Sequence, residues 1–171
     1  MKILTAMWVV LALASIAAAP AFAQKAADPL ESRLVARKVV VVQGRESLAD
    51  AGAAKPGDVI EYVASYRNTG KDAITGLQAT MPIPSHTEYL PGTARPAKAR
   101  ASLDGQLFAG IPLKRSVTRD AKLVEEPVPY REYRYLRWLA GELRGGKSVS
   151  FTARVRVVDD RPSNEPGSRM P

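Results

Sequence analysis

Segment 59–67 alternates between two kinds of side chain, and this pattern constrains the fold more than any other feature of the chain. Every second position is apolar or aromatic, namely Ile60, Tyr62, Ala64 and Tyr66. The positions between them are mostly polar. A period of two places one set on the buried face of a half-exposed β-strand and the other on its solvent face. The pattern therefore predicts a strand that puts Ile60, Tyr62 and Tyr66 in the core.

Several other segments read as short strands separated by turns. Val39–Val42 is a β-branched run, Asn68-Thr69-Gly70 is a turn signal, and Asp104-Gly105 is a hairpin signal. The expected strands lie within 34–43, 60–67, 74–81, 87–90, 97–109, 130–139 and 148–158. Residues 44–57 and 111–129 read as loops, the second with room for one short strand. About seven short strands predict an all-β, immunoglobulin-like antiparallel β-sandwich, with Leu136 and Trp138 on one face, filling the space between its sheets.

The first 23 residues have the pattern of a signal peptide. Lys2 precedes an apolar stretch over 3–19, and Ala21-Phe22-Ala23 is the small-x-small pattern that a signal peptidase reads, so cleavage is expected between Ala23 and Gln24. An uncleaved membrane anchor is the alternative, because the apolar stretch is about long enough to span a bilayer. The expected organisation is a signal peptide over 1–23, a flexible leader over 24–34, the sandwich over 35–158 and a disordered tail over 159–171. After signal removal no membrane span is expected.

If the chain is exported, its charge and cysteine content limit how it is stabilised and what it can bind. The chain has no cysteine, so packing and strand pairing alone must hold it. Its formal charge of +8 includes Lys2, and loss of that one lysine leaves +7. In the periplasm or outside the cell, the available polyanions are membrane phosphates, envelope polysaccharides and acidic proteins, and nucleic acid is not an expected partner. The basic residues are scattered, which favours a plain solvated surface over a dedicated polyanion site.

A series of short motifs follows a recognisable order along the chain. They are Gly57-Asp58, Tyr62, Asn68-Thr69-Gly70, Ile83-Pro84, Tyr89, Pro91-Gly92, Trp138, Leu143, Gly145-Gly146 and Ser148-Val149-Ser150-Phe151. Over residues 35–158 this order resembles the bacterial conserved-repeat family of immunoglobulin-like envelope domains, known as domain of unknown function number eleven. Met81 stands where the family usually has Asp, His86 stands where it often has Gly, and one copy replaces the usual tandem array. The resemblance implies a fold and an envelope location, and it supplies no catalytic site.

Residue types that carry enzyme chemistry are sparse. His86 is the single histidine, and no patterned nucleophile accompanies it. The pairs Glu125-Glu126 and Asp159-Asp160 are adjacent in sequence, so in an extended chain their side chains point apart. Ser102–Phe108 faintly resembles an Asp-box hairpin, and we interpret it as a turn. The sequence thus predicts no enzyme, no metal site and no cofactor.

Segment 130–138 is the best binding candidate. With Leu136 and Trp138 inward, alternation places Tyr133, Tyr135 and Arg137 on the outer face. Tyr and Arg are enriched at interfaces, although stacked Tyr and Arg are also common on solvent-facing strands. The leading hypothesis is a non-enzymatic envelope module that contacts a protein partner through this face or an edge strand. The alternative is a polysaccharide-binding module that uses the same aromatic–basic face on an anionic polymer.

Overall fold

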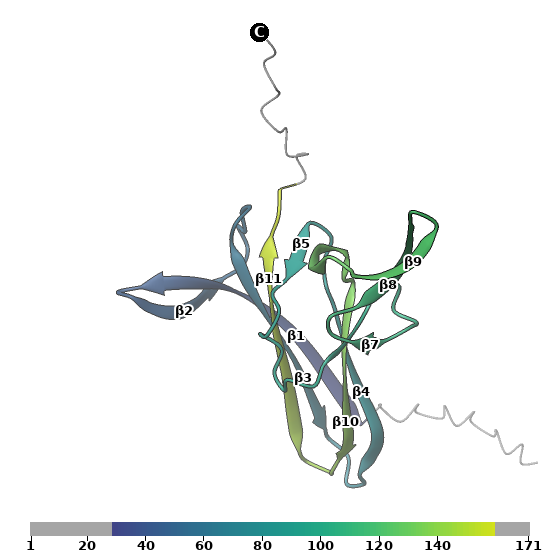
Figure 1. Cartoon of the computed structure of the whole chain (residues 1–171). Coiled ribbons are helices and arrows are strands. Elements are labelled where there is room, and N and C mark those ends of the chain that lie inside the picture. The colour runs from purple at the N-terminus through teal and green to yellow at the C-terminus, as the bar shows by residue number, and fades with distance from the viewer. Residues whose placement is uncertain (1–28, 160–171) are drawn as a thin grey trace, which may run out of the picture.

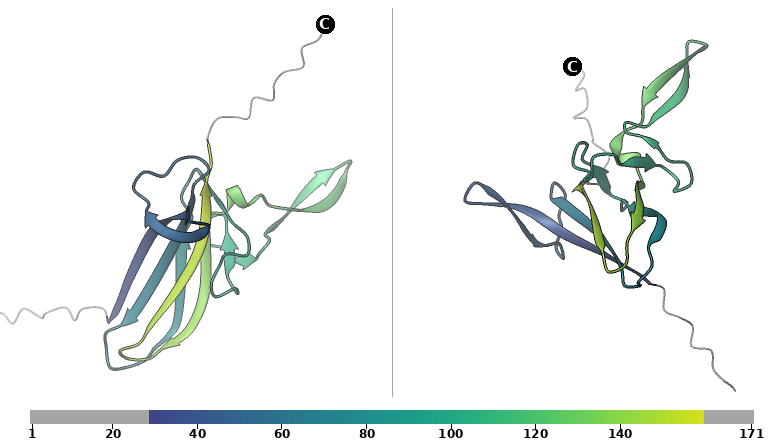
Figure 2. Two further views of the ribbon diagram at one scale, coloured as in Figure 1. Left: turned by 90° about the vertical axis from the view of Figure 1, so that its left-hand side faces the viewer. Right: turned by 90° about the horizontal axis from the view of Figure 1, so that it is seen from below.

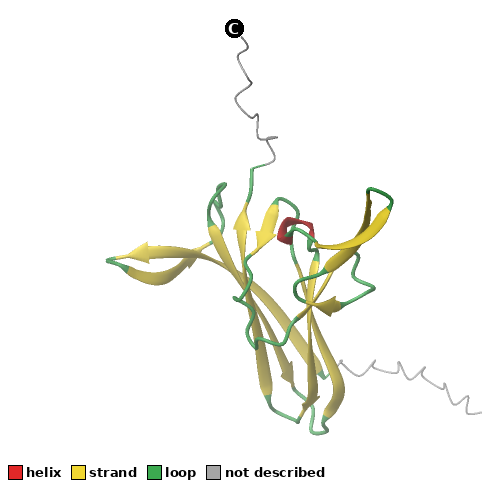
Figure 3. Ribbon diagram, viewed as in Figure 1, coloured by secondary structure: helices red, strands yellow, loops and turns green. Residues whose placement is uncertain are grey.

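The computed structural model describes residues 29–159, and these residues form an antiparallel β-sandwich without an α-helix (Figures 1 and 3). The predicted fold class is therefore confirmed. The predicted signal peptide, its cleavage site at Ala23 and Gln24, and tail residues 160–171 lie outside the described residues. The strands are β1 Leu30–Val42, β2 Arg45–Asp50, β3 Val59–Asn68, β4 Ile74–Pro82, β5 Thr87–Tyr89, β6 Arg100–Ser102, β7 Ala109–Gly110, β8 Lys114–Arg119, β9 Lys122–Pro127, β10 Tyr135–Leu143 and β11 Ser148–Val157, with a 3₁₀ turn η1 over Tyr130–Glu132.

The larger sheet has the strand order β2-β1-β3-β11-β5. The central strand β3 pairs antiparallel along its length with β1 on one side and with β11 on the other. Strand β2 pairs only with the second half of β1, from Arg37 opposite Asp50 to Val42 opposite Arg45. Residues 30–36 of β1 therefore form an edge of this sheet.

The smaller sheet has the order β4-β10-β6-β7, and a separate pair joins β8 to β9. Strand β10 is central: Trp138 lies opposite Ala79 of β4, and Tyr135 lies between Pro82 of β4 and Ser102 of β6. Figure 2 shows the two sheets facing each other, with the β1–β2 hairpin (blue) and the β8–β9 hairpin (green) projecting away from them in different directions.

The core lies between the two sheets. Ile60, Leu136 and Trp138 are buried as predicted, whereas Tyr62 and Tyr66 are half-buried and pack against the margin of the core. The Trp138 ring lies 5.3 Å from that of Phe151, between centroids. Its indole Nε1 donates a hydrogen bond of 2.7 Å to the Pro96 carbonyl, which satisfies the one polar atom that this side chain brings into the interior.

The predicted turn after β3 is held by a buried asparagine. Asn68 is fully buried, and its Nδ2 donates to the carbonyls of Asp72 and Leu143 at 2.7 and 2.8 Å. Its Oδ1 accepts from the Gly70 amide at 3.0 Å. One side chain thereby links the β3–β4 turn to the end of β10. All three hydrogen bonds serve backbone groups, and the buried Leu143 carbonyl would otherwise have no partner away from water.

Three boundaries differ from the sequence prediction. Residues 30–34, expected in a flexible leader, are the start of β1. Residues 44–57, read as a loop, contain β2, and residues 111–129 contain the β8–β9 hairpin rather than at most one short strand. The described residues thus hold eleven strands instead of about seven.

Both unpredicted hairpins turn through two residues with positive φ. The pairs are Gln43-Gly44 and Asp120-Ala121. Such turns match the twist of paired strands, and Asn-Gly or Asp-Gly are their usual sequences. Gln-Gly and Asp-Ala are weak signals for this turn, which explains why both hairpins escaped prediction.

Candidate functional site

Tyr133 does not lie on an outer face, which corrects the sequence prediction. It is fully buried, and its hydroxyl accepts a hydrogen bond of 2.6 Å from the Leu113 amide. Its ring is stacked on that of Tyr89 and meets that of Tyr130 edge-on. Burial raises the pKa of the Tyr133 phenol. Strand β10 begins only at Tyr135, and the η1 turn ends at Glu132, directly before Tyr133. The period of two that holds along β10 therefore does not extend back to Tyr133.

Tyr135 and Arg137 do share the outer face of β10, but both are half-buried against other parts of the chain. The Arg137 guanidinium lies 3.6 Å from the centre of the Phe108 ring, and its Nε donates to Thr80 Oγ1 at 3.0 Å. The Tyr135 ring lies so close to Gly105 that a Cβ there would approach within 3.0 Å. The guanidinium of Arg137 and one face of the Tyr135 ring are thus occupied by contacts within the chain.

The segment that covers this face is the 103–108 loop between β6 and β7. Its turn is organised by Asp104, whose Oδ1 accepts hydrogen bonds from the amides of Gln106 and Leu107 and from the Ser102 hydroxyl. The same bonds, the Gln106 amide foremost, lower the pKa of the Asp104 carboxyl. The interpretation of 102–108 as a turn agrees with this geometry.

The outer face of the larger sheet carries a second group of polar side chains, which the sequence did not single out. In its upper part Arg154 is paired, with Nε 2.8 Å from Glu61 Oε2 and Nη1 3.0 Å from Glu46 Oε2. Lower on the same face lie Arg33 and Arg67, neither of which has an ion pair within residues 29–159.

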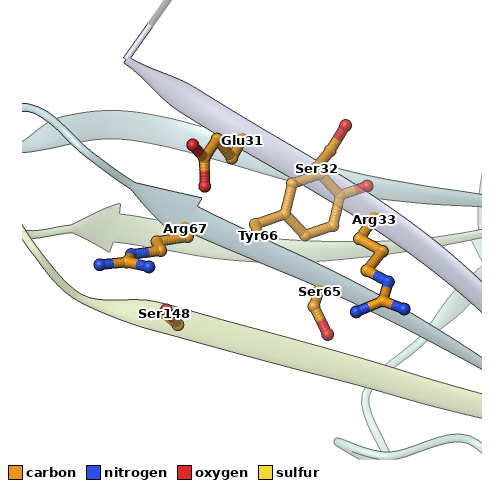
Figure 4. A pocket seen from close by; sticks show the side chains of 7 residues that line it. All are labelled: Glu31, Ser32, Arg33, Ser65, Tyr66, Arg67 and Ser148. Atoms are coloured by element: carbon orange, nitrogen blue, oxygen red, sulfur yellow. The ribbon is translucent and has the colours of Figure 1, made fainter.

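A hollow of about 470 Å³ lies between Arg33 and Arg67. Figure 4 shows Arg67 beside Glu31 and Ser148 at one end of it, and Arg33 beside Ser65 at the other. Ser65 Oγ and Ser150 Oγ are hydrogen-bonded to each other at 3.0 Å. Arg33 escaped notice because residues 24–34 were assigned to a leader and not to a strand.

The β1–β2 hairpin, which we call the β1–β2 arm, exposes aliphatic side chains. Val41 is 72% exposed, Val42 56% and Leu48 47%. Because neighbouring residues of a strand point to opposite faces, Val41 and Val42 place apolar surface on both sides of the arm. The unbroken run Val39–Val42 indicates apolar side chains on both faces of the strand, since a strand with one solvated face would alternate apolar and polar residues.

The β8–β9 hairpin forms a second arm, which is more strongly charged. Arg115 lies 3.3 Å from Glu126 and 2.9 Å from Glu132 of η1, and Arg119 also pairs with Glu126 at 2.9 Å. Leu123 at its tip is exposed. The Arg115–Glu132 pair connects this arm to the body of the domain.

The described residues lack two kinds of feature, a cluster of metal-binding side chains and a membrane-spanning helix. Residues 29–159 contain no group of three or more His, Asp or Glu side chains placed to hold a metal ion. Among those residues no helix is long and apolar enough to cross a bilayer. His86 lies exposed in the β4–β5 loop with φ of 61°.

Comparison with known proteins returned no match to a protein-family model, a curated protein or a solved structure. The order of motifs from Gly57 to Phe151 therefore remains the basis for a family resemblance.

Proposed function

We propose that this chain is a non-enzymatic, exported module of the bacterial cell envelope that contacts another protein through the β1–β2 arm. The observation that carries the proposal is the exposure of Val41, Val42 and Leu48 on a hairpin that stands clear of the sandwich (Figure 1). Val41 and Leu48 lie on the same face of the arm, since Leu48 pairs with Val39, and adjoining exposed apolar side chains are typical of an interaction site. A hairpin of this kind also costs conformational freedom to keep ordered, and contact with a partner offsets that cost.

The alternative, polysaccharide binding, has less support. Flat sugar surfaces are usually stacked on exposed aromatic rings. Of the three residues expected to form such a platform, Tyr133 is buried, Tyr135 packs on Gly105 and Arg137 is held by Phe108 and Thr80. The β1–β2 arm itself carries no aromatic residue.

Export and envelope location form part of the proposal. They are supported by the signal-peptide pattern over 1–23. Membership of the conserved-repeat envelope family is supported by the motif order and by an all-β sandwich in which the Trp138 strand pairs with β4 and the last strand pairs with β3.

In-cell photocrosslinking tests this proposal. A photoreactive residue in place of Val41 should capture one discrete envelope protein. The same residue in place of Leu107, an equally exposed aliphatic position on a different surface, should not. No discrete protein from position 41 would contradict the proposal, and envelope polymer captured equally from both positions would favour polysaccharide binding.

Polar replacement of the arm should separate binding from folding. We predict that Val41→Ser with Leu48→Ser reduces co-purification of the captured partner at least about tenfold, because the interface then buries less apolar surface. The stability to urea should change by no more than about 0.5 kcal/mol, because both side chains are already exposed. Leu107→Ser is the matched control. Loss of capture in the control as well would show that the arm is not the contact surface.

A further inference from the structure

The first half of β1 presents an unpaired strand edge. No strand covers residues 30–36 on the side away from β3 within the described part of the chain. The Thr69 amide donates a hydrogen bond of 2.7 Å to the Pro29 carbonyl, so Pro29 points its carbonyl toward the β3 side. The odd-numbered residues of β1 that follow point their N–H and C=O groups the same way. By the alternation of an antiparallel ladder, Ser32, Leu34 and Ala36 direct their N–H and C=O groups toward the open side.

Hollows lie on both faces of this edge. The outer hollow of Figure 4, about 470 Å³, is bordered by two arginines, Arg33 and Arg67, and by one carboxylate, Glu31. An inner one of about 170 Å³ is bordered by Leu34 and Tyr66 and reaches Thr80 of the facing sheet. Leu34 is 47% exposed although it lies on the inner face. The side chains of one added strand would therefore lie alternately beside Arg33 on the outer face and beside Leu34 on the inner face.

The two faces differ in charge. Arg33 and Arg37 point to the outer face of the edge, and neither has an ion-pair partner among residues 29–159. The inner hollow is bordered by Leu34, Ala64 and Tyr66 with the hydroxyl side chains Ser32 and Thr80, and Arg33 is its one charged neighbour. Charge complementarity thus calls for acidic side chains on the outside and apolar ones on the inside.

We infer that residues 30–36 of β1 accept an extended segment of the partner protein, paired antiparallel in line with β2, in which apolar and acidic residues alternate. Strand addition of this kind takes its affinity from main-chain hydrogen bonds and its specificity from the pockets for alternate side chains. The inference rests on the proposed function, because it assigns the mode and chemistry of the same protein contact. A second copy of this chain is not the occupant, because no segment within residues 29–159 alternates apolar and acidic residues over five positions.

A synthetic octapeptide that alternates valine and glutamate is the probe. Added to the ¹⁵N-labelled protein, purified as the cell processes it, the peptide should shift the amide signals of Ser32, Leu34 and Ala36 and slow their hydrogen exchange about tenfold or more. A valine–lysine octapeptide is the matched control for charge. The valine–glutamate peptide methylated on the amides that face β1 is the control for main-chain pairing. Neither control peptide should protect these amides.

Two kinds of variant locate the contact. Leu34→Pro removes one outward N–H, and proline is tolerated at such positions of an edge strand, so peptide affinity should fall about tenfold or more with the fold retained. Arg33→Glu with Arg37→Glu should weaken the glutamate peptide and strengthen the lysine peptide. Arg33 and Arg37 are both exposed and have no ion-pair partner among residues 29–159, so their replacement should not disturb the fold. This double variant therefore keeps the test valid if Leu34→Pro fails to fold. Arg156→Glu, on the far side of the same sheet face, should change neither affinity.

The outcomes separate this inference from the proposed function. Peptide binding that disappears in both β1 variants supports the inference. Absence of binding at millimolar peptide, or shifts confined to other strands, overturns it. Capture of a discrete partner from position 41 that persists in the β1 variants overturns the inference and leaves the proposed function standing. Absence of capture by the photoreactive residue at position 41, in a protein without the β1 substitutions, overturns the proposed function itself.

Discussion

Asn68 shows how one residue ties together segments that are distant in sequence. Its amide group serves the β3–β4 turn and the end of β10 at once. The Asn-Thr-Gly motif predicted a turn in which the asparagine bonds nearby backbone, and the bond from the Gly70 amide agrees with that. The bond to Leu143, 75 residues away, could not be predicted, because it depends on how the two sheets come together.

Replacement of Asn68 should be costly. We expect Asn68→Ala to lower the free energy of unfolding by about 3 kcal/mol, because the buried Leu143 carbonyl and the partly buried Asp72 carbonyl lose their donor. Urea unfolding followed by circular dichroism measures this. Gln78→Ala, at an exposed amide on β4, is the control and should change stability little. A loss below about 1 kcal/mol for Asn68→Ala would contradict the structural role assigned to this side chain.

The carboxyl of Asp104 offers a prediction about pH. Hydrogen bonds from the Gln106 and Leu107 amides favour its charged form, so its pKa should lie below the ordinary value near 3.8. A folded-state pKa below the unfolded value gives stability that is present above pH 3.8 and is lost as pH falls through the folded pKa. Side-chain carbon NMR during an acid titration measures that pKa directly. In Ser102→Ala the pKa should rise, and a value at or above 3.8 in the unmodified protein would refute the assignment.

The elements of the sandwich differ in how far their sequences determine them. Strands β3, β4 and β11 carry clear period-two patterns, and they were placed within a few residues. The arms did not follow from local patterns, because Gln43-Gly44 and Asp120-Ala121 are weak turn signals and prolines surround β8 and β9. The outer face of β10 was placed correctly for Tyr135 and Arg137 and wrongly for Tyr133, where η1 breaks the period.

The 103–108 loop should be coupled energetically to β10 through one contact. A double-mutant cycle of Phe108→Ala and Arg137→Ala should give an interaction free energy of about 0.5–1 kcal/mol, the range for a cation over an aromatic ring at a partly exposed site. Thermal or urea unfolding of the four proteins supplies the values. Phe108→Ala with Leu48→Ala serves as the control pair, since Leu48 lies on β2 in the other sheet and shares no partner with Phe108 among the contacts described above. Additive effects of Phe108→Ala and Arg137→Ala would show that the stacking contributes nothing.

At the scale of the whole molecule, two features combine: a compact sandwich and sheet edges that it leaves open. Alternation, turn residues and the Trp138 strand were enough to predict the sandwich. They could not show that β1 extends beyond the facing sheet, because the coverage of a strand depends on the number of strands in the opposite layer. The exposed aliphatics of the β1–β2 arm result from that unequal coverage, whereas the open edge at residues 30–36 results from the shortness of β2.

Tryptophan fluorescence reports on the sandwich as a unit. In the protein that begins after Ala23, Trp138 is the single tryptophan, and it is 2% exposed. Its emission should be blue-shifted in the native protein and should move to the red in one cooperative step with urea. Free N-acetyltryptophanamide provides the exposed reference. Native emission equal to that reference would contradict the burial of Trp138 between the sheets.

The most direct test of the central claim, that the first hairpin of the sandwich is the contact surface, is hydrogen–deuterium exchange of this protein in isolated envelopes compared with the purified protein. We predict slower exchange in the envelope for peptides that cover residues 30–50, with unchanged exchange for β6, β7 and the β8–β9 hairpin. Equal exchange of residues 30–50 in the two samples would contradict the claim.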